Sequence, residues 1–453
     1  MAKSQDTYVC QSCGAVYAKW AGRCDACGQW NTIELEVNDA PPGGLSAKTA
    51  KKGNSLTLDA LEGNMAEVAR YPSGNQEFDR AVGGGLVPGG ALLVGGDPGV
   101  GKSTLLLQVA SGLARGGVKT AYLSGEEAVA QIRMRAKRVG LEKAPVGLAS
   151  GTALRDILAT LKQEKPQAVI IDSIQTMWSD TLPAAPGTVT QVRACAQELV
   201  RFAKNSDCVL ILVGHVTKDG QLAGPRVVEH LVDAVLYFES ESGRSFRILR
   251  AVKNRFGAAH EIGVFEMASD GLREVSNPSV LFLNESDSSV SGATVFAGIE
   301  GTRPLLCEFQ ALVSASSLGA PRRAVVGWDS ARLSMLLAVL DTRCGLDFGR
   351  HDVFLNVAGG LKISEPAADL AAAAALLSAR LDVAMPPKLV AFGEVGLSGA
   401  VRPVPQMAAR QAEAAKLGFE QSLTPTSTDK NKAPLKALTV STLGELVEYV
   451  KGL

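Results

Sequence analysis

Between residues 56 and 275 the chain alternates short apolar runs with amphipathic stretches. Apolar runs bounded by turn residues are typical of buried strands, and apolar residues three or four apart are typical of helices. The predicted strands occupy residues 91–96, 119–124, 168–172, 209–215, 234–239 and 245–253. The predicted helices occupy residues 103–115, 129–139, 154–164 and 189–205. This alternation predicts an α/β domain with a mostly parallel sheet that helices cover on both faces.

Other segments flank this α/β domain. Residues 1–34 contain a cysteine cluster, and residues 35–55 are rich in Pro, Gly, Ser, Thr and Lys without periodicity, which predicts a linker. Residues 276–453 contain further strand-like segments, an Ala/Leu-rich helix near 370–377 and a terminal helix. We therefore expect a small N-terminal domain at 1–34, a linker, the α/β domain at 56–275 and a C-terminal α+β domain at 276–453.

The charge balance narrows the possible functions. Forty-six Lys and Arg residues balance 46 Asp and Glu residues. This excludes a globally basic nucleic-acid coat, so any contact with an anionic polymer must be local. No apolar run approaches the ~20 residues that span a bilayer, and no secretory signal opens the sequence. We expect a cytoplasmic protein without a membrane segment.

Four of the eight cysteines form the cluster Cys10-x2-Cys13-x10-Cys24-x2-Cys27. Disulfides are rare in a reducing cytosol, and two CxxC turns can present four thiolates to one tetrahedral zinc ion. A redox dithiol is the alternative. The spacing favours a zinc ribbon, and because four protein ligands leave no open position, the predicted role of zinc is structural.

A phosphate-binding motif, G-x4-G-K-S, follows the predicted strand 91–96 and precedes a helix. In this context the backbone amides cradle phosphates, the lysine reaches the β- and γ-phosphates, and the serine hydroxyl binds Mg²⁺. The motif predicts a site for ATP or GTP with Mg²⁺. The residues expected to bind the nucleotide are Gly96, Asp97, Pro98, Gly99, Val100, Gly101, Lys102, Ser103 and Thr104.

Two further strand ends carry candidate catalytic carboxylates. Asp172 ends an apolar run and would reach Mg²⁺ directly or through water. Glu126 and Glu127 follow the strand 119–124, and one of them would position the attacking water. We favour Glu126, because Glu127 is as well explained by a solvated helix start. His215 ends another strand, and there a γ-phosphate sensor and a structural histidine are equally plausible.

Lys253 and Arg255 follow the predicted strand 245–253, in the pentapeptide KNRFG. Residues i and i+2 of an extended segment project to the same side, so these two could form a pair of cations. Such a pair could stabilise a transferring phosphoryl group as an arginine finger does, within one subunit or across an interface. An ordinary charged strand end is the alternative.

These motifs, together with IIDSIQ and GHVTKDGQLAGPRVVEH, resemble those of the RadA (Sms) family of bacterial DNA repair proteins. The resemblance covers nearly the whole chain. It implies a RecA-like ATPase core that forms a hexameric ring and binds ATP. It also implies action on single-stranded DNA and on branched recombination intermediates alongside the RecA recombinase, and a functional role for Lys253 and Arg255.

Residues 276–453 resemble the proteolytic domain of Lon protease, most strongly from 351 to 453. That enzyme needs a serine nucleophile and a lysine base. Ala367 stands where the serine is expected, and the stretch expected to hold the lysine includes Ala408. An alanine is neither a nucleophile nor a base, so we expect a non-proteolytic scaffold.

Two loops follow strands of the α/β domain, at 178–192 and 218–229. The resemblance to RecA-like rings implies that they face a central channel, where cations would bind DNA without reading its sequence. The candidate DNA-binding residues are Arg193, Lys218 and Arg226.

The sequence thus predicts a DNA-stimulated ATPase that promotes branch migration of recombination intermediates during RecA-mediated strand exchange and break repair. A regulatory RecA-like ATPase acting on protein partners, of the clock-protein type, is the first alternative. An ATP-dependent protease is the second, which the residues Ala367 and Ala408 disfavour.

Overall fold

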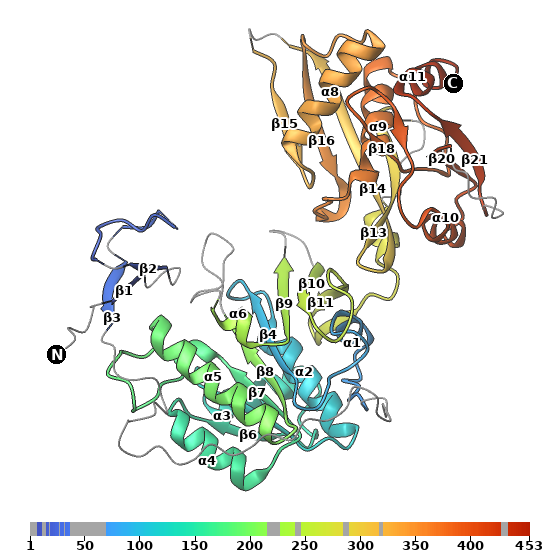
Figure 1. The fold of residues 1–453 in the computed structure, drawn as a ribbon. Helices are drawn as coiled ribbons and strands as arrows, with labels where there is room; N and C mark the ends of the chain where they lie inside the picture. The colour runs from blue at the N-terminus through green and yellow to red at the C-terminus, as the bar shows by residue number, and fades with distance from the viewer. Residues whose placement is uncertain are drawn as a thin grey trace, which may run out of the picture. The chain divides into compact units, whose positions relative to one another are not determined.

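The computed structural model describes residues 7–10, 15–17, 19–26, 28–30, 32–36, 69–214, 227–240, 246–283, 290–316, 320–426 and 434–453. The chain divides into two compact units, Met1–Val275 and Ser276–Leu453. Each unit has its own sheets and helices (Figure 1). None of the described helices is both long enough and apolar enough to span a bilayer.

The first unit contains a nine-stranded sheet in the order β12-β11-β10-β9-β4-β8-β7-β5-β6. Its strands are β4 (Ala91–Gly96), β5 (Thr120–Ser124), β6 (Gly147–Ser150), β7 (Ala168–Asp172), β8 (Val209–Val213), β9 (Ala234–Ser240), β10 (Phe246–Asn254), β11 (Ile262–Ala268) and β12 (Gly271–Glu274). The six strands from β9 to β6 run parallel, whereas β10, β11 and β12 extend the sheet in antiparallel fashion.

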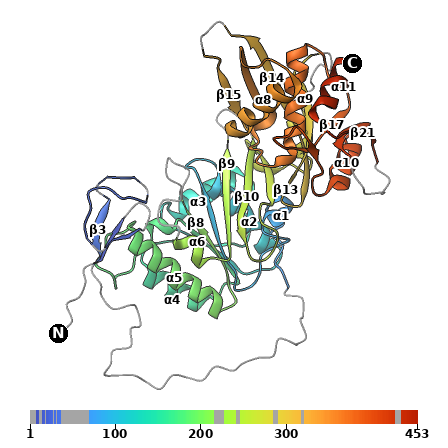
Figure 2. The same cartoon turned by 45° about the horizontal axis from the view of Figure 1, so that its top comes forward.

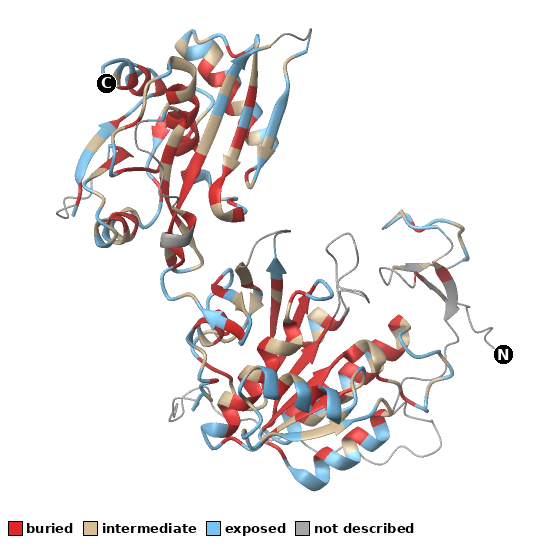
Figure 3. Cartoon of the chain, turned by 180° about the vertical axis from the view of Figure 1, so that it is seen from behind, coloured by how far each residue is buried: buried red, intermediate tan, exposed pale blue. Residues whose placement is uncertain are grey.

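Helices cover both faces of this sheet. They are α1 (Gln76–Ala81), α2 (Lys102–Arg115), α3 (Val129–Arg138), α4 (Leu154–Glu164), α5 (Val189–Asn205) and α6 (Val227–Leu231). Strand β4 is buried along its whole length and alternates between two apolar cores. Leu92 and Val94 join the core formed with α1, α2 and α3, whereas Ala91 and Leu93 join the core formed with α4, α5 and α6. This double burial stabilises a central parallel strand (Figure 3).

The α/β prediction is confirmed, with all six predicted strands and all four predicted helices in place to within two residues at either end. The antiparallel strands β11 and β12 and the short parallel strand β6 were not predicted. The N-terminal segment forms a small antiparallel sheet from β1 (Thr7–Cys10), β2 (Val16–Tyr17) and β3 (Ile33–Glu36). Strand β3 therefore runs two residues into the predicted linker, and the rest of that linker lies outside the described residues.

The second unit is built on a seven-stranded mixed sheet in the order β15-β16-β14-β13-β17-β20-β21. Its strands are β13 (Ala293–Glu300), β14 (Arg303–Ala315), β15 (Arg323–Val326), β16 (His351–Val357), β17 (Leu389–Ala391), β20 (Gln421–Pro425) and β21 (Lys436–Val440), with β18 (Glu394–Val395) and β19 (Val401–Arg402) as a separate pair. The helices are α7 (Pro278–Phe282), α8 (Ser330–Cys344), α9 (Asp369–Leu381), α10 (Met407–Lys416) and α11 (Leu443–Lys451). Figure 2 shows these elements from a second direction.

Helix α9 contains the predicted Ala/Leu-rich segment, and every residue from Asp369 to Ser378 is buried. The small alanine side chains let this helix pack closely against β13 and β14. Asp369, at its first turn, is fully buried and forms a two-point ion pair with Arg332 of α8. Desolvation raises the pKa of this carboxyl, while the hydrogen bonds from Arg332 act in the opposite direction.

A second ion pair, with a buried arginine, lies beside the position where a protease would carry its nucleophile. Ala367 is 1% exposed and lies in a short 3-10 turn directly before α9. Two residues earlier, Glu365 accepts hydrogen bonds from both terminal nitrogens of Arg410 on α10. The Arg410 side chain is also 1% exposed, and its nitrogens donate to Ala297 O at 2.9 Å and Pro405 O at 3.1 Å. Arg410 thus ties α10 to β13 and to the turn before α9.

Arg410→Met should destabilise the second unit by about 3–5 kcal/mol, because it leaves the Glu365 carboxylate and two backbone carbonyls without their donor. Calorimetry of the full chain should show one unfolding transition moving to lower temperature. Lys388→Met is the matched control, because Lys388 and its partner Glu420 are both more than half exposed and such pairs contribute at most about 1 kcal/mol. Equal shifts for the two variants would contradict the structural role of Arg410.

Candidate functional site

The phosphate-binding loop joins the carboxyl end of β4 to the first turn of α2. At Gly96 the backbone has φ +153°, and a Cβ atom there would lie 2.3 Å from Phe238 O on the neighbouring strand β9. Gly101 has φ +111° and begins α2 without a side-chain cap. The first amides of α2 therefore remain available to an anion, at the helix end where the dipole favours negative charge.

Lys102 lies along the inside of this loop. Its side chain is 4% exposed, and Nζ donates to Gly96 O at 2.7 Å and to Asp97 O at 2.9 Å. Burial lowers the pKa of this ammonium group, whereas the nearby carboxylates of Asp172, Asp97 and Glu126 raise it. The site thus gathers acidic groups around one buried cation that a triphosphate would also contact.

Asp172 ends β7, the second strand along from β4 in the sheet, and is 5% exposed. Tyr122 of β5 donates a hydrogen bond from its hydroxyl to Asp172 Oδ2 at 2.5 Å. Burial raises the pKa of Tyr122 well above its ordinary value, and the charge of Asp172 raises it further. The phenol therefore stays protonated and acts as the donor. The sequence analysis did not single out Tyr122.

Glu126 and Glu127 follow β5, where the Ser124 hydroxyl accepts hydrogen bonds from both of their backbone amides at 3.2 and 2.9 Å. Their side chains then diverge. Glu126 accepts a hydrogen bond from Ser173, the residue directly after Asp172, whereas Glu127 forms an ion pair with Arg135 of α3. Glu126 is thus the carboxylate held next to Asp172, which agrees with the preference for Glu126 but does not test its role.

Arg247, near the start of β10, is a second residue that the sequence analysis did not single out. Its Nε donates to Val100 O of the phosphate-binding loop at 3.2 Å. The contact forms because β10 pairs antiparallel with β9, which places its first residues beside the loop. No local sequence signal reports such a pairing, so spacing alone could not have found this cation.

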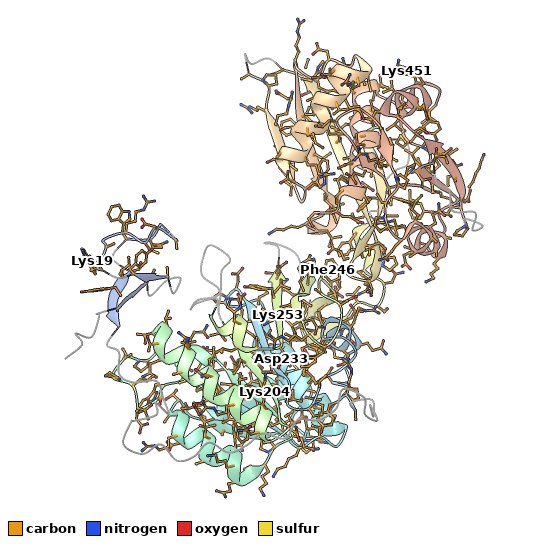
Figure 4. The ribbon with its side chains drawn as sticks, viewed as in Figure 1. Lys19, Lys204, Asp233, Phe246, Lys253 and Lys451 are labelled. Carbon is orange, nitrogen blue, oxygen red and sulfur yellow. The ribbon has the colours of Figure 1, made fainter. Side chains whose placement is uncertain are left out.

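Lys253 lies at the other end of β10 and near Asp233 (Figure 4), beside the amino end of β4. Arg255 directly follows the strand. Asp233 connects these segments, since its carboxylate accepts from the backbone amide of Ala91 at 3.1 Å and from Arg255 Nη1 at 3.2 Å. The five residue steps from Ala91 to Gly96 cover about 17 Å at ~3.3 Å per residue. An arginine side chain cannot cross that distance, so Arg255 does not reach the phosphate-binding loop of its own chain.

The two cations also differ from the expected matched pair. Lys253 Nζ donates to Glu229 O at 2.7 Å and Val232 O at 2.8 Å, at the end of α6. Burial, first, and then the charge of Arg255 lower the pKa of Lys253. The Arg255 side chain is 58% exposed. Lys253 therefore braces α6, while Arg255 is the cation that remains accessible at this edge.

Sequence relatives decide the family. The DNA repair protein RadA of Brucella abortus is 58% identical over 432 residues, which cover 94% of this chain and 92% of the relative. The RadA proteins of Pseudomonas aeruginosa and Haemophilus influenzae are 48% and 46% identical, and each alignment covers 99% of this chain and at least 98% of the relative. The chain belongs to the RadA family of DNA repair proteins.

Family models match three parts of this RadA-family chain. They describe a rubredoxin metal binding domain at residues 8–34, an AAA domain at 64–221 and the subunit ChlI of Mg-chelatase at 315–428. The chain therefore combines an N-terminal zinc ribbon, a RecA-like ATPase core and a C-terminal ChlI/Lon-like domain, which confirms the predicted fold class and family.

The RadA-family ribbon brings two of the four predicted zinc ligands into one buried cluster. Cys10 and Cys24 are both 0% exposed and share this cluster with Ile33. Backbone hydrogen bonds from Cys10 N to Ala15 O and from Gly28 N to Cys24 O close a tight turn beside each cysteine. Cys13 and Cys27 lie outside the described residues. The folding of the chain around Cys10 and Cys24 suits a four-thiolate zinc site.

Three of the four remaining cysteines behave as apolar core residues. Cys195, Cys208 and Cys307 are buried, and burial raises the pKa of the first two thiols to about 12. Such thiols are neither metal ligands nor nucleophiles at neutral pH.

The candidate DNA-binding residues are only partly described. Arg193 is exposed, and it lies within α5 rather than in the preceding loop. Lys218 and Arg226 lie outside the described residues, as does His215.

Substitution of one predicted ligand tests whether the cysteine cluster binds zinc. Cys10→Ser should lower the zinc content of the purified chain from about one ion per chain, because a site with three thiolates binds zinc less tightly. Cys195→Ser is the matched control, since Cys195 is buried in the core of the ATPase domain. Plasma mass spectrometry measures the metal, and an unchanged zinc content in Cys10→Ser would contradict the assignment.

Proposed function

We propose that the chain is a DNA-dependent ATPase that processes recombination intermediates and promotes branch migration during RecA-mediated strand exchange and DNA break repair. One observation carries this proposal. The residues proposed to bind phosphate lie at the carboxyl end of β4, whereas Arg255, with a side chain that is 58% exposed, lies beside the amino end of that strand. This separation supports a site that a neighbouring copy completes.

The residues at the phosphate-binding loop fit ATP with Mg²⁺. The amides from Gly96 to Thr104 and the Lys102 ammonium would hold the phosphates, and the half-buried hydroxyl of Ser103 makes no hydrogen bond with another described residue. Ser103 and Asp172 would hold Mg²⁺, which neutralises charge on the phosphates when bound. Glu126 would orient the attacking water.

Arg255 would act in trans, on the nucleotide of a neighbouring subunit. This use follows from its 58% exposure and from the length of β4, which separates it from the phosphate-binding loop of its own chain. Asp233 binds one guanidinium nitrogen, Nη1, and fixes the direction of the side chain. A head-to-tail arrangement closes into a ring where the rotation between subunits closes, and we propose a hexameric ring.

The proposed substrate is single-stranded and branched DNA, and the proposed partner is the RecA recombinase, in the cytoplasm. The relatives are named as DNA repair proteins, which supports this choice. With 46 basic and 46 acidic residues the chain can bind DNA only through local cations. Arg193, Lys218 and Arg226 are proposed to contact phosphates, so binding should weaken as salt rises.

Comparison of ATP hydrolysis with and without single-stranded DNA tests this function. We expect DNA to raise the rate at low salt and to lose this effect as salt rises. Lys102→Ala should abolish hydrolysis in both conditions, because it removes the cation that contacts the β- and γ-phosphates. A wild-type rate that DNA leaves unchanged would favour the alternative, a regulatory ATPase acting on protein partners.

Arg255→Ala should lower the hydrolysis rate by about 10³-fold while ATP affinity changes little, because an arginine finger acts on the transition state. Arg201→Ala is the matched control, since Arg201 is an exposed arginine on α5 that pairs with Glu198. Mixing Arg255→Ala chains with Lys102→Ala chains should restore part of the activity, because some sites then combine an intact Lys102 with a neighbour's Arg255. Without such recovery, the trans assignment is wrong.

A further inference from the structure

The hydrogen bond between Tyr122 and Asp172 links two neighbouring strands directly at the phosphate-binding edge. In the parallel register Tyr122 is opposite Ile170, and Asp172 is opposite Ser124, two residues further along. The Tyr122 side chain therefore leans along the strand toward the carboxyl edge to reach Asp172 Oδ2 at 2.5 Å. The ring is fully buried in the core that also contains Leu106 and Ile132.

This contact determines how the Asp172 carboxylate is held. Among the described residues, no other group donates a hydrogen bond to its side chain. A carboxylate that is 5% exposed must keep its few donors, because an unsatisfied buried acceptor costs about 1–3 kcal/mol. Since Oδ2 is bound by the phenol, the second oxygen, Oδ1, remains for a metal ion or its water.

We propose that Tyr122 is a positioning residue that orients Asp172 for magnesium. This inference rests on the proposed function, in which Asp172 holds Mg²⁺. Partners that hold a metal-binding carboxylate fix its rotamer, and their loss typically costs 10–100-fold in metal affinity or activity. Tyr122 lies in β5, the same strand that leads into Glu126. In this proposal, one strand therefore positions both Asp172, which would hold the metal, and Glu126, which would orient the water.

A purely structural role is the competing explanation, because Tyr122 also fills the core. Tyr122→Phe separates the two roles, since it keeps the ring and its packing and removes only the hydroxyl. Tyr71→Phe is the matched control. Tyr71 also packs against this core, but its hydroxyl accepts only from Gln167 Nε2, at 3.4 Å.

The experiment measures ATP hydrolysis by the full chain as a function of Mg²⁺ concentration. For Tyr122→Phe we expect the half-saturating Mg²⁺ concentration to rise about tenfold or more and the maximal rate to fall. Binding of a fluorescent ATP analogue in EDTA should stay within about twofold of wild type, because the amides and Lys102 are untouched. Tyr71→Phe should match wild type in every measurement.

A wild-type Mg²⁺ requirement in Tyr122→Phe would overturn the inference. If the unfolding temperature of that variant is also lower, the hydroxyl only stabilises the fold.

Asp172→Asn, measured in parallel, separates this failure from failure of the proposed function. If Asp172→Asn keeps wild-type Mg²⁺-dependent hydrolysis, then Asp172 does not hold the metal and the assignment beneath the inference is wrong. If Asp172→Asn loses activity while Tyr122→Phe keeps it unchanged, only the role of Tyr122 is wrong.

Discussion

The close approach of the Gly96 backbone to the Phe238 carbonyl is the constraint on which the site depends. A Cβ atom at residue 96 would lie 2.3 Å from that oxygen, so only glycine lets β4 turn at this point while it remains paired with β9. The turn directs the amides of the loop inward and begins α2 at Gly101 without a side-chain cap. The uncapped helix end, the buried Lys102 and the acidic residues around it all follow from where this strand ends.

The two ends of β4 carry different candidate functional groups. The carboxyl end carries the phosphate-binding loop, whereas the amino end is held by Asp233, which binds the Ala91 amide and Arg255. In the proposed trans arrangement, Arg255 would therefore be linked through Asp233 to the start of the fully buried strand β4. Lys253 connects the same edge to the end of α6, directly after the segment that contains Lys218 and Arg226.

The features that could be predicted from the sequence are those formed by residues that are close together in the chain. The phosphate-binding motif, Asp172 and the fully apolar strands are contiguous patterns, and each is in its expected place. Tyr122 and Arg247 could not be found in this way, because each acts across strand pairings between residues that are distant in sequence. The different partners of Lys253 and Arg255 could not be predicted for a similar reason. The i, i+2 rule gives the side of a strand, but the position of Asp233 and the carbonyls of α6 determines which cation stays accessible.

The three carboxylates at this edge of the sheet differ in their hydrogen-bond partners. Asp172 is held by a neutral phenol, Glu126 by a neutral hydroxyl and Glu127 by the guanidinium of Arg135. Only the third of these partners neutralises its carboxylate. Asp172 and Glu126 therefore lie near Lys102 with neutral hydrogen-bond donors, whereas Glu127 is paired with a guanidinium. This difference in partners, rather than any difference between two adjacent glutamates in sequence, supports the proposal that Glu126 orients the water.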